Sequence, residues 1–90
     1  SKPTGRDKTT LTFELQGAET PGVLSKALSL FSDAKINLSK IESMEKGSLI
    51  DYVFWLNVDE HRENMRRQLA ELEKLSKWLV VHGSYPRAFP

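Results

Sequence analysis

The stretch that decides the fold is Pro21–Met44, PGVLSKALSLFSDAKINLSKIESM. Its first part predicts an amphipathic helix, because apolar residues recur along it at helical spacing. These residues are Val23, Leu24, Ala27, Leu28, Leu30, Phe31 and Ala34. We expect Thr20 to be the N-cap and Pro21 to occupy the first helical position, where a missing N–H costs nothing.

A strand follows this helix, and its apolar pattern slips by one residue. Ile36 and Leu38 alternate as strand residues do, but the next apolar residue is Ile41 rather than Lys40. A one-residue slip turns side chains to the other face of a sheet. We therefore expect a β-bulge or a late strand start between residues 37 and 40, in a strand that runs over 38–44.

The start of the helix is a candidate ligand site. Gly22 has no Cβ, so the first backbone N–H groups of the helix are open to a ligand. Such a helix N-terminus binds carboxylate or phosphate groups. The same residues also suit an ordinary helix start, and both interpretations stay open at this point.

The remaining elements follow from the same periodicities. Alternating apolar residues predict strands over 9–15, 50–58 and 78–85. A second helix is expected over 60–75, capped by Asp59. Its buried stripe, at helical spacing, consists of Met65, Leu69, Leu72 and Leu75.

The element order is strand–helix–strand–strand–helix–strand. Right-handed crossovers then predict a four-stranded antiparallel sheet in the order 4-1-3-2, with both helices on one face. This is a ferredoxin-like α+β sandwich. We expect residues 9–86 to form this domain, residues 1–8 to be a linker from an upstream domain, and residues 87–90 to be a tail.

The composition narrows the class of partner. A net charge of +1 gives no basic field, so nucleic acid is not expected as a partner. The chain has no cysteine, which excludes a disulfide framework and fits a cytoplasmic location. It also has no apolar run long enough to span a membrane.

Catalysis within this chain is not expected. His61 and His82 are isolated in the sequence, so a structural role is favoured over metal ligation for each. The first loop has no cation to hold an acyl phosphate, and no Ser/His/Asp or Cys/His spacing is apparent. We predict no catalytic residue, no metal site and no cofactor.

An RNA-binding module is the alternative, because the RNA-recognition fold has the same element order. Its sheet carries stacking aromatic residues, and Tyr52, Phe54 and Trp55 lie on the third strand here. However, Tyr52 and Phe54 share the apolar face that we assign to the helices. Only Trp55 would then remain on the open face.

Two motifs resemble the ACT domain, a small ligand-binding regulatory module. PGVL at 21–24 is similar to the family's helix-start motif, and INLSKIES at 36–43 is similar to its Asn-Leu-x-x-Ile-Glu-Ser motif. The pair resembles the phenylalanine-responsive branch, found in prephenate dehydratases and aromatic amino acid hydroxylases. PTGRDKTTLTF at 3–13 and HGSYPRA at 82–88 resemble the C-terminal regulatory domain of prephenate dehydratase.

The resemblance implies feedback inhibition of a prephenate dehydratase, a lyase, whose catalytic domain would belong to the same parent chain. In this family L-phenylalanine, or a related amino acid, binds between two ACT domains of a homodimer or tetramer. The implied contacts from one copy are Pro21, Gly22, Val23 and Leu24. Those from its neighbour are Asn37, Leu38, Ser39, Lys40, Ile41, Glu42 and Ser43. The regulatory domain of an aromatic amino acid hydroxylase is the alternative within the family.

Two positions depart from the family's pattern. Met44 and Glu45 follow Ser43, where the family has Arg-Pro. Val23 replaces the usual Ala, which adds bulk beside the expected pocket.

Overall fold

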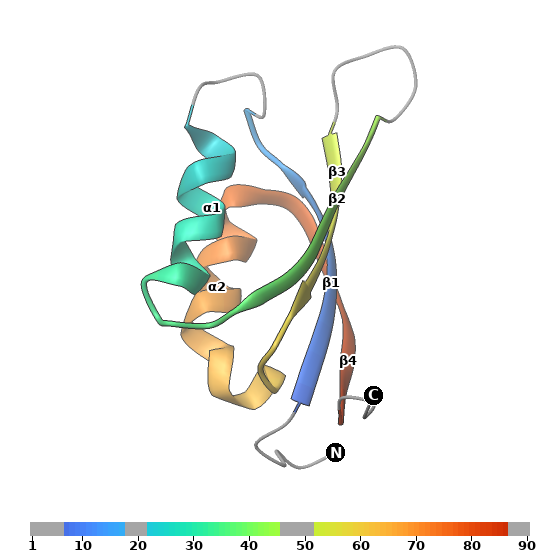
Figure 1. Cartoon of the computed structure of the whole chain (residues 1–90). Helices are drawn as coiled ribbons and strands as arrows, with labels where there is room; N and C mark the ends of the chain where they lie inside the picture. Colours follow the sequence, from blue (N-terminus) through green and yellow to red (C-terminus); the bar gives the residue numbers. More distant parts are fainter. Residues whose placement is uncertain (1–6, 18–21, 46–51, 87–90) are drawn as a thin grey trace.

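The structure, a computed structural model of the chain, describes residues 7–17, 22–45 and 52–86 (Figure 1). Four strands and two helices follow one another in the predicted order, strand–helix–strand–strand–helix–strand, with a 3-10 turn before the second helix. The elements are β1 (Asp7–Leu15), α1 (Val23–Ser32), β2 (Leu38–Glu45), β3 (Tyr52–Val58), η1 (Arg62–Met65), α2 (Arg66–Leu75) and β4 (Ser76–Pro86). Neither of the two described helices is long and apolar enough to cross a membrane.

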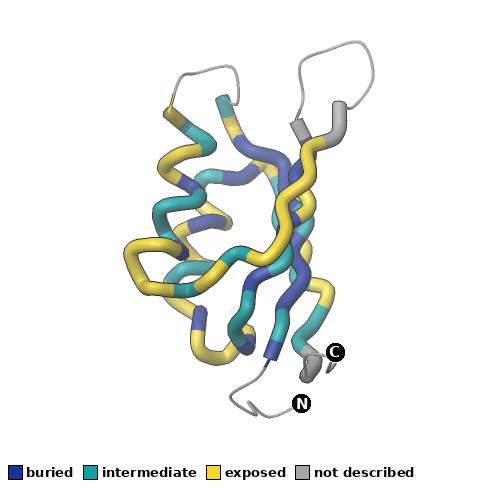
Figure 2. Tube along the Cα trace, viewed as in Figure 1, coloured by how far each residue is buried: buried dark blue, intermediate teal, exposed yellow. Residues whose placement is uncertain are grey.

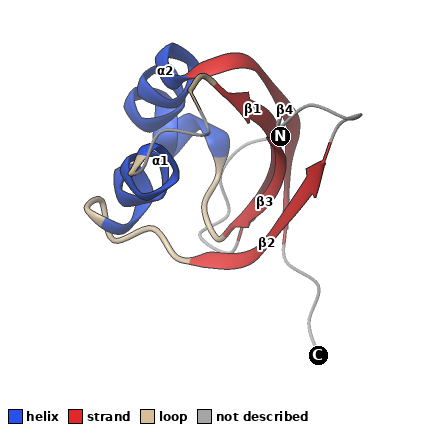
Figure 3. Ribbon diagram, turned by 90° about the horizontal axis from the view of Figure 1, so that it is seen from above, coloured by secondary structure: helices blue, strands red, loops and turns tan. Residues whose placement is uncertain are grey.

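The four strands form one antiparallel sheet in the order β2-β3-β1-β4. This is the predicted order 4-1-3-2 read from the other edge. Figure 3 shows that both helices lie on the same face of the sheet, which leaves the other face uncovered by any described element. The predicted ferredoxin-like sandwich is confirmed.

The core lies between the sheet and the two helices (Figure 2). The predicted inward faces of the strands are confirmed, and the rings of Phe13 and Phe54 stack at its centre with centroids 5.7 Å apart. The predicted stripe of α2 also faces inward, with Met65 and Leu72 fully buried. The buried apolar residues of this core are Leu11, Phe13, Leu15, Ala27, Phe31, Phe54, Leu56, Val58, Met65 and Leu72.

Helix α1 begins later than the sequence predicts. Its N-cap is Gly22, whose φ is +89° and whose C=O accepts the first helical hydrogen bond from the N–H of Lys26 at 2.9 Å. The predicted N-cap at Thr20 and first helical position at Pro21 are therefore wrong. Both residues lie outside the described ranges. The left-handed backbone at this cap requires glycine and sets the helix start.

The exit of α1 is a Schellman turn. The N–H of Ile36 donates to Phe31 O at 2.9 Å, and the N–H of Lys35 donates to Ser32 O at 3.0 Å. Lys35 has φ of +60°, the left-handed conformation that this turn requires. The chain reverses there and enters β2.

The predicted bulge is confirmed at Ser39. Leu38 pairs with Val58 and Lys40 pairs with Asn57, so Ser39 is one extra residue on β2. The extra residue brings Ile41 opposite Leu56, on the same face of the sheet as Leu38. The slip in the sequence pattern thus keeps both apolar residues on the helix side.

Two strand boundaries differ from the prediction because backbone pairing extends past the apolar pattern. β1 begins at Asp7 rather than Thr9, so Asp7 and Lys8, assigned to the linker, pair with Pro86 and Tyr85 of β4. β4 begins at Ser76 rather than Trp78. The predicted start of the third strand at Ile50, and the turn at 47–48, lie outside the described residues.

The predicted cap of the second helix is also wrong. Asp59 accepts a hydrogen bond from Asn37 Nδ2 at 2.8 Å and donates its own N–H to Asn37 O at 2.8 Å. The carboxylate is therefore engaged with the loop before β2. The buried His61 caps the 3-10 turn η1, since its Nδ1 accepts from the N–H of Glu63 at 3.1 Å. The N-cap of α2 itself is Met65, which makes no side-chain capping bond.

Candidate functional site

A shallow groove runs between α1 and the start of β2. Its volume is about 440 Å³, and Leu24, Leu28 and Leu38 form its apolar wall. Ser25, Ser29 and Ser32 form its polar rim. The structure thus brings together Leu24 and Leu38, two of the predicted ligand-binding residues.

The serine rim of this groove lies along one side of α1. Ser25, Ser29 and Ser32 recur at spacings of four and three residues, which is the signal of a polar stripe along one side of a helix. Ser29 and Ser32 donate their hydroxyls back to helix carbonyls, Lys26 O at 2.8 Å and Ser29 O at 3.4 Å. Within the described residues, the Ser25 hydroxyl has no such bond and is available to a ligand.

At the N-terminal end of this groove, α1 presents open backbone donors. The N–H groups of Val23, Leu24 and Ser25 have no hydrogen-bond partner among the described residues. A Cβ placed on Gly22 would meet no atom of the described residues within 4 Å. The side chains of Val23 and Leu24 are half-buried against the core. This end offers backbone hydrogen bonds to an anionic group beside an apolar wall.

The predicted residues of β2 divide between two faces of the sheet. Ile41 faces the helix side and is 44% exposed, because β2 is an edge strand. Lys40 and Glu42 pair with Asn57 and Trp55 on the opposite face and form an ion pair with each other at 2.9 Å. Strand alternation therefore places Lys40 and Glu42 away from the groove. Ser39 and Ser43 are exposed on the same strand.

Leu24 and Leu38 line one groove, but a single chain does not bring Gly22 and Asn37, the other key residues of the two predicted halves, together. Gly22 begins α1 and Asn37 follows its exit turn, and ten helical residues between them span about 15 Å. Figure 1 shows that β2 then runs back alongside α1 in the opposite direction. The end of β2, not its beginning, lies level with the start of α1. Pro21, also predicted in this site, is outside the described residues.

The open face of the sheet carries an aromatic cluster. The ring of His82 stacks on Trp55 with centroids 5.4 Å apart, and its Nε2 lies 2.6 Å from Thr12 Oγ1. Trp55 is 36% exposed and Val80 is 45% exposed. Val53, on the same face, is buried.

Both histidines have contacts within the chain, His61 as a helix cap and His82 on Trp55. Among the described residues, no group of three His, Asp or Glu side chains is placed to hold a metal ion. Phe54 is buried in the core, so it cannot stack on a base. Of Phe54 and Trp55, the two predicted stacking residues whose side chains the structure describes, Trp55 alone lies on the open face, where His82 already stacks on it.

Comparison with known proteins relates this chain to prephenate dehydratases. It is 44% identical over 90 residues to the bifunctional chorismate mutase/prephenate dehydratase of Aquifex aeolicus, with 97% of this chain and 24% of that protein covered. The chain thus spans about a quarter of that relative's length and corresponds to its C-terminal region. No family model matches the chain.

Solved structures agree with this relationship. Prephenate dehydratase from Arthrobacter aurescens, determined in complex with L-Phe, superposes with a TM-score of 0.86 at 36% identity, over 97% of this chain and 29% of that one. GqqA, described as a novel type of quorum quenching acylase, superposes with a TM-score of 0.83 at 33% identity, over 98% of this chain and 32% of that one. The homologues of this chain are prephenate dehydratases, and the chain matches one region of them.

Proposed function

We propose that this chain is an amino-acid-binding regulatory domain of the ACT type, which binds L-phenylalanine for feedback inhibition of prephenate dehydratase. The observation that carries the proposal is the open start of α1 at Gly22, at one end of the groove whose apolar wall begins with Leu24. Backbone N–H groups would hold the carboxylate, and the apolar wall would contact the ring. The similar Arthrobacter aurescens enzyme, crystallised with L-Phe, supports this choice of ligand.

The ligand site requires two copies of the chain. A two-fold axis beside β2 would run one β2 antiparallel to the other, so the start of one strand would lie opposite the end of the other. Asn37 and Leu38 of the second copy would then approach the start of α1 in the first. This arrangement joins the two halves of the site that about 15 Å separates in one chain.

The catalytic partner is a separate part of the proposal. We infer a prephenate dehydratase domain in the parent chain, because the curated relatives are dehydratases that extend well beyond this region. GqqA is similar over the same region and is described as an acylase. The proposal that the domain binds an amino acid does not depend on which activity is attached, and the cytoplasmic location stays a prediction.

Titration calorimetry on the 90-residue chain tests the ligand. L-phenylalanine should release heat and saturate, whereas D-phenylalanine should bind much more weakly. The inverted α-carbon cannot place carboxylate, amine and ring on their three contacts together. L-tyrosine and L-tryptophan define the selectivity of the apolar wall. The absence of heat with all four amino acids at millimolar concentration would exclude the proposed function.

A further inference from the structure

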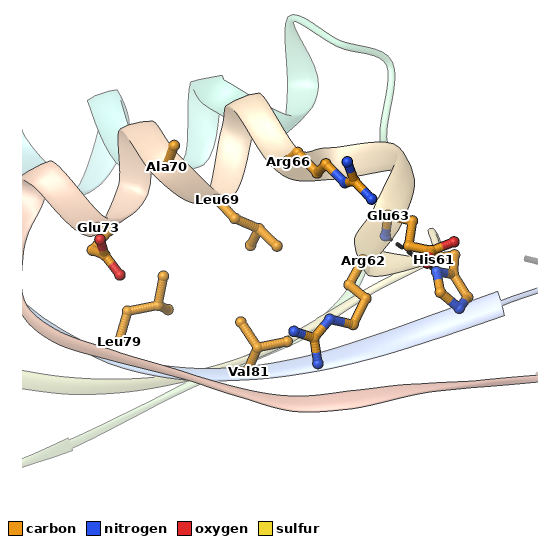
Figure 4. Close-up of a pocket in the computed structure, with 9 residues that line it drawn as sticks. All are labelled: His61, Arg62, Glu63, Arg66, Leu69, Ala70, Glu73, Leu79 and Val81. Atoms are coloured by element: carbon orange, nitrogen blue, oxygen red, sulfur yellow. Dashed lines mark hydrogen bonds between the residues drawn. The ribbon is translucent and has the colours of Figure 1, made fainter. Parts of the chain in front are cut away.

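A second and larger groove lies on the far side of the molecule, between α2 and the edge strand β4. Its volume is about 580 Å³, and its floor is apolar (Figure 4). The floor residues are Leu69, Ala70, Leu79 and Val81. This groove is lined by none of the residues assigned to the proposed amino-acid site.

Opposite charges stand at the two ends of this groove. Arg62 and Arg66 lie at the end near Val81, and Glu73 lies at the end near Leu79 (Figure 4). Arg66 and Glu73 are seven residues apart, so they share one face of α2 and lie about 10 Å apart along its axis. Within the described part of the chain, neither Arg66 nor Glu73 forms an ion pair. Both charges are exposed and free to meet charges on a partner.

The strand beside this groove has a regular edge segment. β4 is the outermost strand of the sheet, and residues 78–81 (Trp-Leu-Val-Val), which include no charge and no proline, pair regularly with β1 between two register shifts. These shifts lie between Ser76 and Trp78 and between Val81 and Ser84, and the outward backbone groups of residues 78–81 meet no described strand. Charges and bulges normally prevent edge strands from pairing with another chain. In β2, at the opposite edge, the bulge at Ser39 and the charges of Lys40 and Glu42 fall within the strand, whereas residues 78–81 of β4 contain neither.

We propose that the β4 edge and the α2 groove bind a second copy of this chain through a two-fold axis. Two β4 strands would pair antiparallel about Val80, and the two α2 helices would meet about Leu69 and Ala70. Figure 4 shows Leu69 above Val81, the chain neighbour of Val80, so the proposed centres of the helix contact and of the strand contact lie close to one level along β4. A single two-fold axis then brings each β4 against the other β4 and each α2 against the other α2.

The charges on α2 are self-complementary about this axis. An antiparallel α2 from the second copy places its Glu73 opposite Arg66, and its Arg66 opposite Glu73, so that two equivalent ion pairs form. The exposed Val80 would meet its own counterpart on the open face of the joined sheet. This interface goes beyond the proposed function, which uses the β2 edge. A chain with both contacts would join dimers into larger assemblies.

Sedimentation of charge-reversed variants tests the interface. Arg66→Glu and Glu73→Arg should each weaken self-association about tenfold, because each places like charges opposite one another at two symmetric positions. The double variant Arg66→Glu/Glu73→Arg restores opposite charges in reversed order and should recover the parent's association. Both substitutions are at exposed positions, and thermal melting verifies that each of the three variants is folded.

The matched control reverses the ion pair formed by Glu71 and Lys74 on α2. Glu71→Lys/Lys74→Glu should leave association unchanged, since neither residue lines the groove. Each measurement is made with and without L-phenylalanine. Association through the β2 edge should respond to the ligand and not to the reversed charges. The proposed amino-acid site and the proposed β4 interface can therefore be disproved independently of each other. A parent chain that stays monomeric at hundreds of micromolar, or a double variant no better than the single ones, overturns the inference.

Discussion

The indole N–H of Trp78 donates a hydrogen bond of 2.8 Å to Oε1 of Glu14 on the neighbouring strand. Glu14 is only 4% exposed, although it lies on the sheet face that no helix covers. Trp78 therefore both shields this carboxylate from water and supplies its donor. The ammonium of Lys77, at 3.5 Å from Oε2, is the second partner of the carboxylate.

Trp78→Phe should destabilise the domain by about 1–3 kcal/mol, because a nearly buried carboxylate oxygen loses its donor. In a domain of this size, each kcal/mol lowers the Tm by about 4–8 °C. Lys77→Met is the control, with an expected loss of about 1 kcal/mol or less, since the Lys77 side chain is 48% exposed. Thermal melting measures both, and equal losses would show that the indole N–H has no special role.

Lys35→Gly should stabilise the chain. A non-glycine residue at φ of +60° costs about 1–2 kcal/mol, whereas the extra backbone entropy of glycine costs about 0.5–1 kcal/mol. The net gain should raise the Tm by a few degrees. Lys26→Gly, in the interior of α1, should instead destabilise the chain by about 1 kcal/mol. A loss of stability in both variants would contradict the Schellman turn.

Gly22→Ala should abolish the rise in Tm that L-phenylalanine produces, because a methyl group would stand over the backbone donors. The φ of +89° means that this substitution also strains the backbone, by about 1–2 kcal/mol. Gly83→Ala is a matched control, since Gly83 has φ of +107° and equally empty space around it. It should cost similar stability and keep the ligand-dependent rise. If both variants keep the rise, the carboxylate is held elsewhere.

Asn37→Ala should have two separable effects. Loss of the hydrogen bond to Asp59 should lower stability by about 1 kcal/mol without ligand. Loss of the proposed contact with the ligand should also reduce the phenylalanine-dependent rise in Tm. Asp59→Ala removes the same hydrogen bond and leaves the Asn37 amide in place. It should lower stability while retaining more of the rise, and an identical response of the two variants would limit Asn37 to a structural role.

Periodicity was sufficient to predict the sheet, both helices and the bulge. The slip in the apolar pattern from Leu38 to Ile41 is local in the sequence. Both residues can face the helices only if the strand contains one extra residue between them, which is the bulge. Element ends were less predictable, because they depend on long-range contacts. Asp59 is a good capping residue, but Asn37 engages it from 22 residues away. His61 then caps the 3-10 turn that precedes the second helix, which sequence position alone does not indicate.

The candidate site could be predicted in part. The motif at the start of α1 indicated Gly22 as a ligand contact, and Gly22 is the N-cap of α1 without a side-chain capping bond. Its contact with a ligand stays a prediction. The division of β2 into two faces follows from pairing with β3, so the prediction did not separate Lys40 and Glu42 from Ile41. The α2 groove was missed, because charges at helical spacing are typical of a solvated face. Only the neighbouring β4 edge shows that those charges flank an apolar floor.

Asp7 pairs with Pro86, so the described chain enters and leaves the domain at adjacent ends of β1 and β4 (Figure 1). Ladder bonds between antiparallel strands lie perpendicular to the strands. A force that separates residues 7 and 86 would therefore break the hydrogen bonds between β1 and β4 one after another, in an unzipping geometry. The domain would yield to mechanical tension between these two points far more readily than a domain pulled in shear.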